Sequence, residues 1–157
     1  MTNEIFSIIR NGLTEHYHLS ISSTPINCDN ELGQNLLQEA IAYYRNSIAV
    51  DLVNRGININ HQDNRGLTPL HYCVQHNNLT IAELLLAKGG KVNILDSSGN
   101  NPLWYAVFYA DGDYQLKEMA TVMDCPESIR HLYDTYRTFA SGKKGIVYAI
   151  NREHARH

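Results

Sequence analysis

Between positions 63 and 95, apolar residues fall in two short blocks that each show the three- and four-residue spacing of an amphipathic helix. The blocks are Leu70, Cys73 and Val74, then Ile81, Leu84, Leu85 and Leu86. Asn77-Asn78 separates them, and Gly89-Gly90 follows the second block, as is typical of a helix C-terminus. The pattern therefore predicts two helices, joined by a tight turn, within one short segment.

The first of these helices has well-defined start signals. Thr68 can act as the N-cap, because its side-chain oxygen can accept a hydrogen bond from the first turn, and Pro69 suits the first helical position, where a missing N–H costs nothing. Thr80 is the candidate cap of the second helix. After this helix, Asn93 leads into an extended turn that returns the chain to Asp96. The segment thus predicts a unit of one turn and two helices.

The same unit recurs along the chain at one fixed spacing, the distance in sequence from Asp63 to Asp96. Forward along the chain, the corresponding residues of Asp63, Gly66, Pro69, Leu70, Tyr72 and Val74 are Asp96, Gly99, Pro102, Leu103, Tyr105 and Val107. Backward, those of Gly66, Leu70, Ala82, Leu85, Gly89 and Asn93 are Gly33, Leu37, Ala49, Leu52, Gly56 and Asn60. Self-similarity at a fixed period is typical of a solenoid, in which each unit buries its apolar face only against its neighbours.

The sequence Thr68-Pro69-Leu70-His71, within a unit of about 33 residues, resembles the ankyrin repeat. The resemblance covers about residues 1–123 and implies an all-α solenoid of helix-turn-helix units with short hairpin-like turns. It divides a single domain, 1–157, into a degenerate N-terminal cap, three repeats, and an atypical C-terminal helix cap with a tail. These parts are residues 1–29, then 30–62, 63–95 and 96–123, then 124–157.

Outside the best unit the pattern is weaker. The first two units predict helices at residues 3–10, 14–21, 35–44 and 47–54. Asn35-Leu36 stands where Thr-Pro is expected, which predicts a less firmly fixed helix start, whereas Asn101 can replace threonine as a cap. Beyond a lengthened turn at 111–113, residues 127–140 have helical spacing and residues 146–150 suit a short strand.

Composition argues against several classes of protein. The net charge is −3, so no overall basic field attracts nucleic acid. No apolar run approaches the length of about 18 residues that a membrane span needs. The first residues lack the basic start of a signal peptide and the cysteine number is odd, so we expect a cytoplasmic, reducing location. Cys73 occupies the small buried position of Ala40 and Ala106, which predicts a packed thiol.

Candidate chemical groups do not form a recognisable site in the sequence. None of the histidines and cysteines considered has the spacing of zinc ligands; they are His16, His18, Cys28, Cys125, His131, His154 and His157. No local signature of a catalytic cysteine and no glycine-rich phosphate loop is present. We therefore expect no enzymatic activity, no metal and no cofactor.

The resemblance implies a protein-binding surface. Partners of ankyrin proteins usually contact the turn residues that flank the glycine and the end of the first helix. The turn positions here are Glu31, Leu32, Gln34, Asn64, Arg65, Leu67, Ser97, Ser98 and Asn100. The helix-end positions are Tyr43, Gln75, His76, Phe108 and Tyr109, and the rings of Tyr43, His76 and Tyr109 form a stripe at one register. Such rings are typical of binding hot spots, although they can equally pack between adjacent helices.

The fourth position of the Thr-Pro-Leu-His motif differs between two units. His71 keeps the histidine, which in ankyrin proteins normally bonds to neighbouring turns, so we expect a structural role for it. Trp104 replaces the histidine in the next unit. It either packs against the 111–113 loop or forms an exposed anchor for a partner.

Together these features predict a non-catalytic module that binds another protein through its concave face. We expect a monomer when the chain is free, and no binding to nucleic acid or membranes. The segment Gly99–Phe108 looks similar to small stand-alone bacterial ankyrin proteins, some of which are immunity proteins that cover a cognate toxin. The alternative is an ankyrin scaffold or effector in which residues 124–157 mediate oligomerisation or a separate activity.

Overall fold

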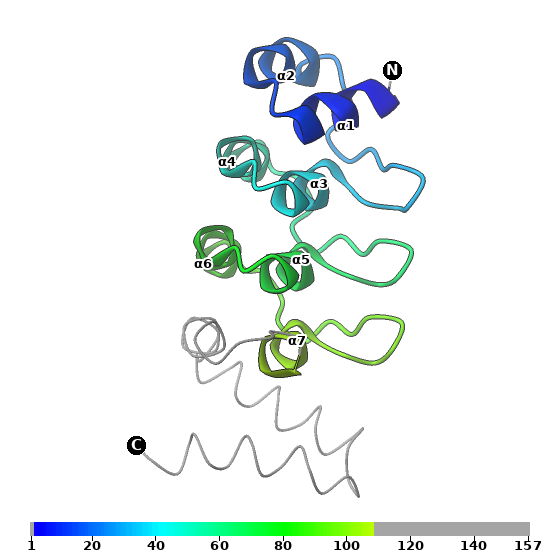
Figure 1. Ribbon diagram of the computed structural model, residues 1–157, viewed down its shortest axis with the longest axis vertical. Coiled ribbons are helices and arrows are strands. Elements are labelled where there is room, and N and C mark those ends of the chain that lie inside the picture. Colours follow the sequence, from blue (N-terminus) through cyan, green and yellow to red (C-terminus); the bar gives the residue numbers. More distant parts are fainter. Residues whose placement is uncertain (1, 109–157) are drawn as a thin grey trace, which may run out of the picture.

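The computed structural model describes residues 2–108 of the 157-residue chain, which form seven helices in a regular stack (Figure 1). The helices are α1 (Thr2–Asn11), α2 (Thr14–Ile21), α3 (Leu36–Ala42), α4 (Asn46–Asn54), α5 (Pro69–Gln75), α6 (Leu79–Ala87) and α7 (Pro102–Phe108). In this part of the chain the only β-type pairing is an isolated bridge between Asp29 and Asn35. The fold is an all-α solenoid, as predicted.

The helices lie in two columns (Figure 1). The first column holds α1, α3, α5 and α7, each in contact with the next, and the second holds α2, α4 and α6. The turns that precede α3, α5 and α7 project side by side from the first column, away from the second (Figure 1). Each complete unit therefore has a helical body and a projecting turn.

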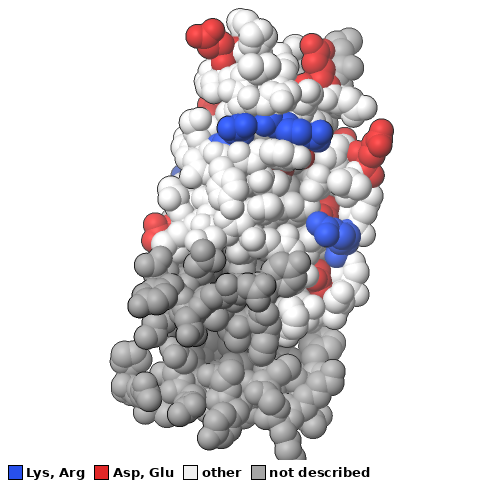
Figure 2. Space-filling view, viewed as in Figure 1, with Lys and Arg blue, Asp and Glu red and all other residues white. Residues whose placement is uncertain are grey.

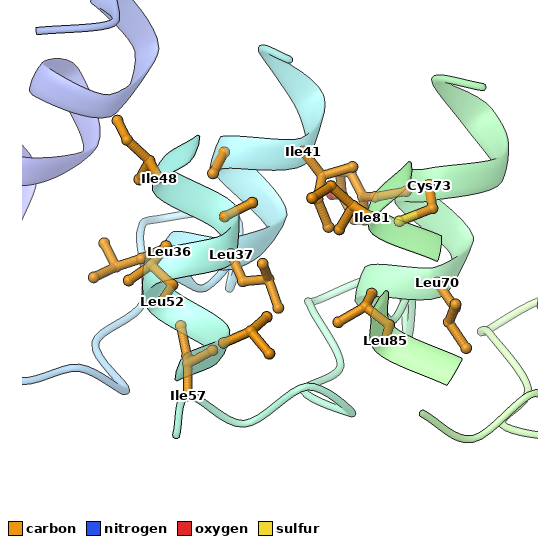
Figure 3. Close-up of a cluster of buried hydrophobic side chains, with 14 of the residues drawn as sticks. Leu36, Leu37, Ile41, Ile48, Leu52, Ile57, Leu70, Cys73, Ile81 and Leu85 are labelled. Carbon is orange, nitrogen blue, oxygen red and sulfur yellow. The ribbon is translucent and has the colours of Figure 1, made fainter. Parts of the chain in front are cut away.

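Apolar side chains fill the space between the columns and between successive units (Figure 3). The small side chains of Ala40, Cys73 and Ala106 recur at one position of the unit and are 0%, 0% and 1% exposed. Leu52 and Leu85, which recur on the second column, are both 0% exposed. Burial raises the pKa of the Cys73 thiol, because a thiolate would be unsolvated there. The prediction of a packed thiol is confirmed.

The start of α3 is fixed by a buried capping box, contrary to the expectation from the sequence. The Asn35 side chain accepts a hydrogen bond from the Gln38 N–H at 3.0 Å, and the Gln38 side chain accepts one from the Asn35 N–H at 2.9 Å. The prediction that this start is less firmly fixed than a Thr-Pro start considered only the missing pair, whereas α3 and α5 both begin with a capping box. Asparagine caps at least as well as threonine, and a glutamine three residues later completes the box.

Residue 38 and its equivalent, residue 71, also connect each unit to the next. Gln38 Nε2 donates to the Leu67 carbonyl at 2.7 Å, and His71 Nε2 lies 3.1 Å from the Asn100 carbonyl. The Thr68 N–H donates to His71 Nδ1 at 3.0 Å, so Nδ1 is the acceptor and Nε2 carries the proton. His71 is 0% exposed, and burial lowers its pKa and keeps the ring neutral. The predicted structural role of His71 is confirmed.

Two helix boundaries differ from the expectation. Asn78, not Thr80, caps α6, since the Asn78 side-chain oxygen accepts a hydrogen bond from the Ile81 N–H at 3.4 Å. Thr80 lies inside the first turn of α6 and is exposed. α3 ends at Ala42 rather than at residue 44, because Tyr44 adopts a left-handed φ of 56° that ends the helix.

Other boundaries agree with the predictions. The expected helices 3–10, 14–21 and 47–54 correspond to α1, α2 and α4. Asn101 caps α7 as predicted, accepting a hydrogen bond from the Trp104 N–H at 2.7 Å. The remaining predictions lie outside the described residues; they concern Tyr109, the 111–113 turn, Cys125, the helix 127–140, the strand 146–150 and the unit boundary at 123–124.

Replacement of His71 by leucine should lower the free energy of unfolding by about 2–4 kcal/mol, because it leaves the buried Thr68 N–H and Asn100 carbonyl unpaired. Replacement by glutamine should restore most of the loss, since Gln38 makes the equivalent pair of bonds. Urea unfolding followed by far-UV circular dichroism measures both variants. Equal destabilisation by leucine and glutamine would contradict the bridging role.

The lowered pKa of buried His71 also predicts a pH dependence. The folded-state pKa lies below the unfolded value of about 6.5, so this stabilisation is complete above pH 6.5 and is lost as the pH falls through the folded-state pKa. The hydrogen bond to the Asn100 carbonyl and, after it, the Asp96 and Asp63 carboxylates oppose this lowering of the pKa but do not cancel it. Urea unfolding at pH 7.5 and pH 5.5 should show a smaller loss of stability for His71→Gln than for the native chain. An identical loss would exclude His71 as the titrating group.

Candidate protein-binding surface

Each projecting turn is held by one polar side chain at its start. Asp63 Oδ1 accepts hydrogen bonds from the N–H groups of Arg65 at 2.8 Å and Leu67 at 2.9 Å. Asp96 makes the equivalent pair of bonds at 2.9 Å, and Asn30 makes it at 2.9 and 3.0 Å. These local bonds fix the shape of each turn and leave the residues at its tip pointing into solvent.

Adjacent turns are also bonded to one another. The Asn64 N–H donates to the Leu32 carbonyl at 3.1 Å, and the Ser97 N–H donates to the Arg65 carbonyl at 2.9 Å. We call the exposed residues of the three turns the turn tips; they are Glu31, Leu32, Asn64, Arg65, Ser97 and Ser98. Their spacing is therefore set by backbone hydrogen bonds between units.

Three predicted contact residues of the turns lie further inward. Leu67 is 2% exposed and belongs to the hydrophobic core, and Gln34 is 9% exposed with its amide donating to the Tyr72 hydroxyl at 2.6 Å. Asn100 is half-buried. The sequence-based interpretation placed them at the surface because each follows the turn glycine, but at this point the chain has already turned back toward the core. We leave Gln34, Leu67 and Asn100 out of the surface.

A tyrosine–carboxylate pair lies between the turn and the helix in the units of α5 and α7. The Tyr72 hydroxyl donates to Asp63 Oδ2 at 2.7 Å, and the same pair recurs one unit later at 2.6 Å. Burial raises the pKa of Tyr72, so its hydroxyl keeps the proton that it donates. Residues 36–41 of α3 and 69–74 of α5 are all buried. These helices expose little beyond their ends.

The ends of the first-column helices present a row of side chains. Tyr43 and His76 are the C-cap residues of α3 and α5, so they share one register along the stack. Arg10 holds the same register in the last turn of α1, and its guanidinium carbon lies 5.4 Å from the centre of the Tyr43 ring. We call Arg10, Tyr43 and His76 the helix-end row. Tyr109, which the sequence places fourth in it, lies outside the described residues.

Tyr43 and His76 differ in how far they are engaged by packing. Tyr43 is 41% exposed. The His76 ring is half-buried: it stacks on Tyr72 with centres 6.2 Å apart and meets the edge of Tyr44 at 5.9 Å. Burial also lowers the pKa of His76. The two interpretations of the stripe therefore apply to different residues. Tyr43 is open to solvent, as a contact residue would be, whereas much of the His76 ring packs against neighbouring rings.

Sequence reasoning missed two residues of this region. Arg10 precedes Tyr43 by one full repeat, so the repeat spacing itself could have found it. Tyr44 is 60% exposed, and its hydroxyl donates to the His76 carbonyl at 2.6 Å. The left-handed φ of Tyr44 recurs one repeat later at Asn77, but the tyrosine itself does not recur, so no spacing of rings marks Tyr44.

The other predicted helix-end residues are less exposed or less fully described. Gln75 and Trp104 are half-buried, and the Trp104 ring meets Tyr105 edge-on with centres 5.4 Å apart. Phe108 ends α7. The loop 111–113, against which Trp104 was expected to pack, lies outside the described residues, so the choice between packing and anchoring stays a prediction.

The described residues show no assembly of groups for metal chemistry. Within residues 2–108, no three His, Cys, Asp or Glu side chains come together in a way that could hold a metal ion. His16 and His18 lie on α2 in the second column and are exposed. None of the helices in this part of the chain combines the length and the hydropathy needed to cross a membrane.

Comparison with known protein families agrees with the fold. A family model described as ankyrin repeats (3 copies) matches residues 6–96 and 37–121. The chain therefore belongs to the ankyrin repeat family. Ankyrin repeats generally mediate protein–protein interactions and serve as non-catalytic scaffolds. Comparison with curated proteins found no match.

The stacking of the turns predicts a difference between two glycines that both have positive φ. A Cβ at Gly66 (φ +75°) would lie 3.0 Å from Asp96 Cα and Ser97 N, whereas one at Gly56 (φ +82°) would meet nothing within 4 Å. Gly56→Ala should therefore cost only the backbone strain, about 1–2 kcal/mol, and Gly66→Ala at least about 1 kcal/mol more. Chemical unfolding measures both costs. Equal costs would mean that the contact between turns is not tight.

Proposed function

We propose that this chain binds a partner protein through the turn tips and the helix-end row. The observation that carries the proposal is the fixed register of these side chains over successive units, set by hydrogen bonds between turns and by the caps of α3 and α5. Side chains held in place lose little conformational freedom on binding, so more of the contact energy remains as affinity.

The dimensions of the units suit a partner element that touches both sets of residues. A first helix such as α3 has 7 residues, so it is about 10 Å long. The turn tips precede this helix in the chain and the helix-end row follows it, so the two sets are separated by about the length of the helix. An α-helix with its side chains is about 10–12 Å across. A helix or a loop of similar width on the partner would therefore reach both sets at once.

The residue types agree with a binding role. Arginine and tyrosine are enriched among interface residues that contribute most to affinity. Arg65 at a turn tip has 67% of its side chain exposed, and Tyr43 in the helix-end row is 41% exposed. Leu32 adds a 63% exposed apolar side chain at the first turn. These three residues are the anchors that we propose.

We further propose that the bound partner is a toxin and that the chain acts as its immunity protein, as a small bacterial protein in the cytoplasm. Binding over the active cleft would block the toxin by occlusion, with no chemistry required of this chain. The support is the likeness of residues 99–108 to small bacterial ankyrin proteins and the non-catalytic character of the family. Such a protein would act as a monomer and bind neither nucleic acid nor membranes. The alternative, a scaffold using residues 124–157, rests on residues outside the described part.

Tyr43→Ala, Leu32→Ala and Arg65→Ala should each weaken partner binding by about 1–3 kcal/mol, which is a rise in Kd of roughly 5- to 150-fold. The partner is first identified by purifying the tagged native chain from its own cells, and titration calorimetry then measures each variant. Leu19→Ala is the matched control, because Leu19 on α2 is 79% exposed but lies in the second column.

Immunity is measured separately by co-expressing the partner with each chain. The native chain and Leu19→Ala should restore growth, and the triple variant Tyr43→Ala, Leu32→Ala, Arg65→Ala should not. A partner that binds all variants alike would exclude the proposed surface. A partner that binds through this surface but is harmless to cells would exclude immunity alone.

A further inference from the structure

Two arginines from different units meet near the N-terminal end of the stack. Arg45 Nη2 donates to the Arg10 carbonyl at 2.9 Å, although the two residues are 35 apart in the sequence. Figure 2 shows Lys and Arg side chains as a continuous band across the upper part of the molecule, with Asp and Glu side chains nearer the edges of the view. The whole chain carries a net charge of −3, so this band is a local concentration of positive charge.

Only one of the two arginines has a carboxylate partner in the described part of the chain. Arg10 pairs with Glu39, whose side chain is 2% exposed, through Nε at 2.9 Å and Nη2 at 2.8 Å. Arg45 forms no ion pair with any residue between 2 and 108, and its buried Nε has no hydrogen-bond partner there. One guanidinium charge is therefore left without a counter-ion in the described part of the chain.

The Arg45 side chain is held against the preceding unit. A Cβ at Gly12 would lie 2.8 Å from Arg45 Cζ, so the absence of a side chain at Gly12 is what admits the guanidinium. Gly12 precedes Arg45 by one full repeat, which places them at equivalent positions of successive units. Because this packing already orders Arg45, its side chain loses little further conformational entropy when an anion binds.

The start of α4 adds to the positive field. Arg45 is the N-cap residue of α4 and makes no side-chain capping bond, whereas Asn78 at the equivalent position caps α6. The first N–H groups of α4 therefore lack a capping side chain, and the positive end of the helix dipole lies beside the guanidinium.

Two tyrosines give the band an apolar border. The Tyr43 ring lies beside the Arg10 guanidinium at 5.4 Å and is 41% exposed, and Tyr44 is 60% exposed. The Tyr44 hydroxyl is tied to the His76 carbonyl, so this ring is also held in position. We call Arg10, Tyr43, Tyr44 and Arg45 the arginine–tyrosine patch.

We infer that the arginine–tyrosine patch binds an acidic segment of the partner protein. An Asp or Glu carboxylate of the segment pairs with Arg45 and with the free edge of Arg10, and apolar atoms of the same segment lie against Tyr43 and Tyr44. Guanidinium–carboxylate bonds are strong because both groups are charged and geometrically matched. The inference rests on the proposed protein-binding function and specifies the chemistry of the partner.

The charge pattern favours a peptide over a nucleic acid as the occupant. Nucleic-acid binding depends on many phosphate contacts along an extended basic surface. Here the cationic side chains form no extended surface: the band is short, a second group of Lys and Arg side chains lies apart from it, and acidic side chains are visible around both in the same view (Figure 2). A short acidic stretch of a protein matches a patch of this size.

A random 12-residue peptide library displayed on phage tests the inference with the full chain as bait. Peptides selected by the native chain should be enriched in Asp and Glu relative to the input library. The most enriched peptide, made synthetically, should bind with a Kd that rises with salt, and exchange of its Asp and Glu for Asn and Gln should weaken it about tenfold.

Matched variants locate the binding on the patch. Arg45→Gln should weaken the acidic peptide about tenfold, whereas Arg55→Gln should change its Kd less than about twofold, because Arg55 lies at the other end of α4 and is paired with Asp51. Arg10 is tested as Arg10→Gln with Glu39→Gln, so that no buried carboxylate is left unpaired; this double variant should also weaken binding. Circular dichroism confirms that each variant is folded.

The result that overturns the inference is a set of selected peptides without acidic enrichment, no selected peptides, or an acidic peptide that binds Arg45→Gln as tightly as the native chain. A 12-nucleotide single-stranded DNA that binds the patch more tightly than the peptide would also overturn it and assign the patch to nucleic acid. If non-acidic peptides are selected and bind less tightly to Tyr43→Ala, only the claim that the bound segment is acidic is overturned. The proposed protein-binding function then still holds.

Discussion

The regular stacking of the structure depends on one buried side chain in each of the second and third units, which joins a helix start to the turn of the next unit. Gln38 and His71 each accept a hydrogen bond from the N-cap N–H of their own helix and donate to a carbonyl one unit further on. In the low-dielectric interior such bonds are strong when complete and costly when broken. These bonds therefore help to set the distance between the joined units and the orientation of the turn that each bond reaches.

Different residue types can fill this bridging position only if they carry both a donor and an acceptor. Neutral histidine and glutamine both meet this condition, because each carries a donor and an acceptor at a similar distance from the backbone. Trp104, at the equivalent position of the next unit, offers an indole N–H and no acceptor, so it cannot accept the bond that Gln38 and His71 accept. The regular bridge between units is thus limited by chemistry to the second and third units.

The same bridges explain where a partner can be contacted. The turns are tied to one another, a tyrosine–carboxylate pair lies behind the turn in the units of α5 and α7, and α3 and α5 are buried along most of their length. What stays exposed is the tip of each turn and the end of each first helix. At the start of α4, Arg45 stands where α6 has the capping residue Asn78, so a cation takes the place of an asparagine there.

The sequence by itself determined the period, the fold class and the registers that recur. Gly66, Pro69, His71 and the buried small residue at 73 could be interpreted singly, because each answers a local requirement of backbone or packing that returns in every repeat. The same spacing was enough to align Tyr43 with His76.

Only the tertiary structure decided which members of those registers face solvent. Leu67 and Leu32 both flank a turn glycine, yet one is 2% and the other 63% exposed, because Leu32 precedes the glycine at the turn tip, whereas Leu67 follows it, where the chain has turned back toward the core. The meeting of Arg10 with Arg45 also follows from stacking, since the two residues occupy different positions of the repeat and come together only where one unit lies against the next. Periodicity defines positions within a unit, and contacts between units define the surface.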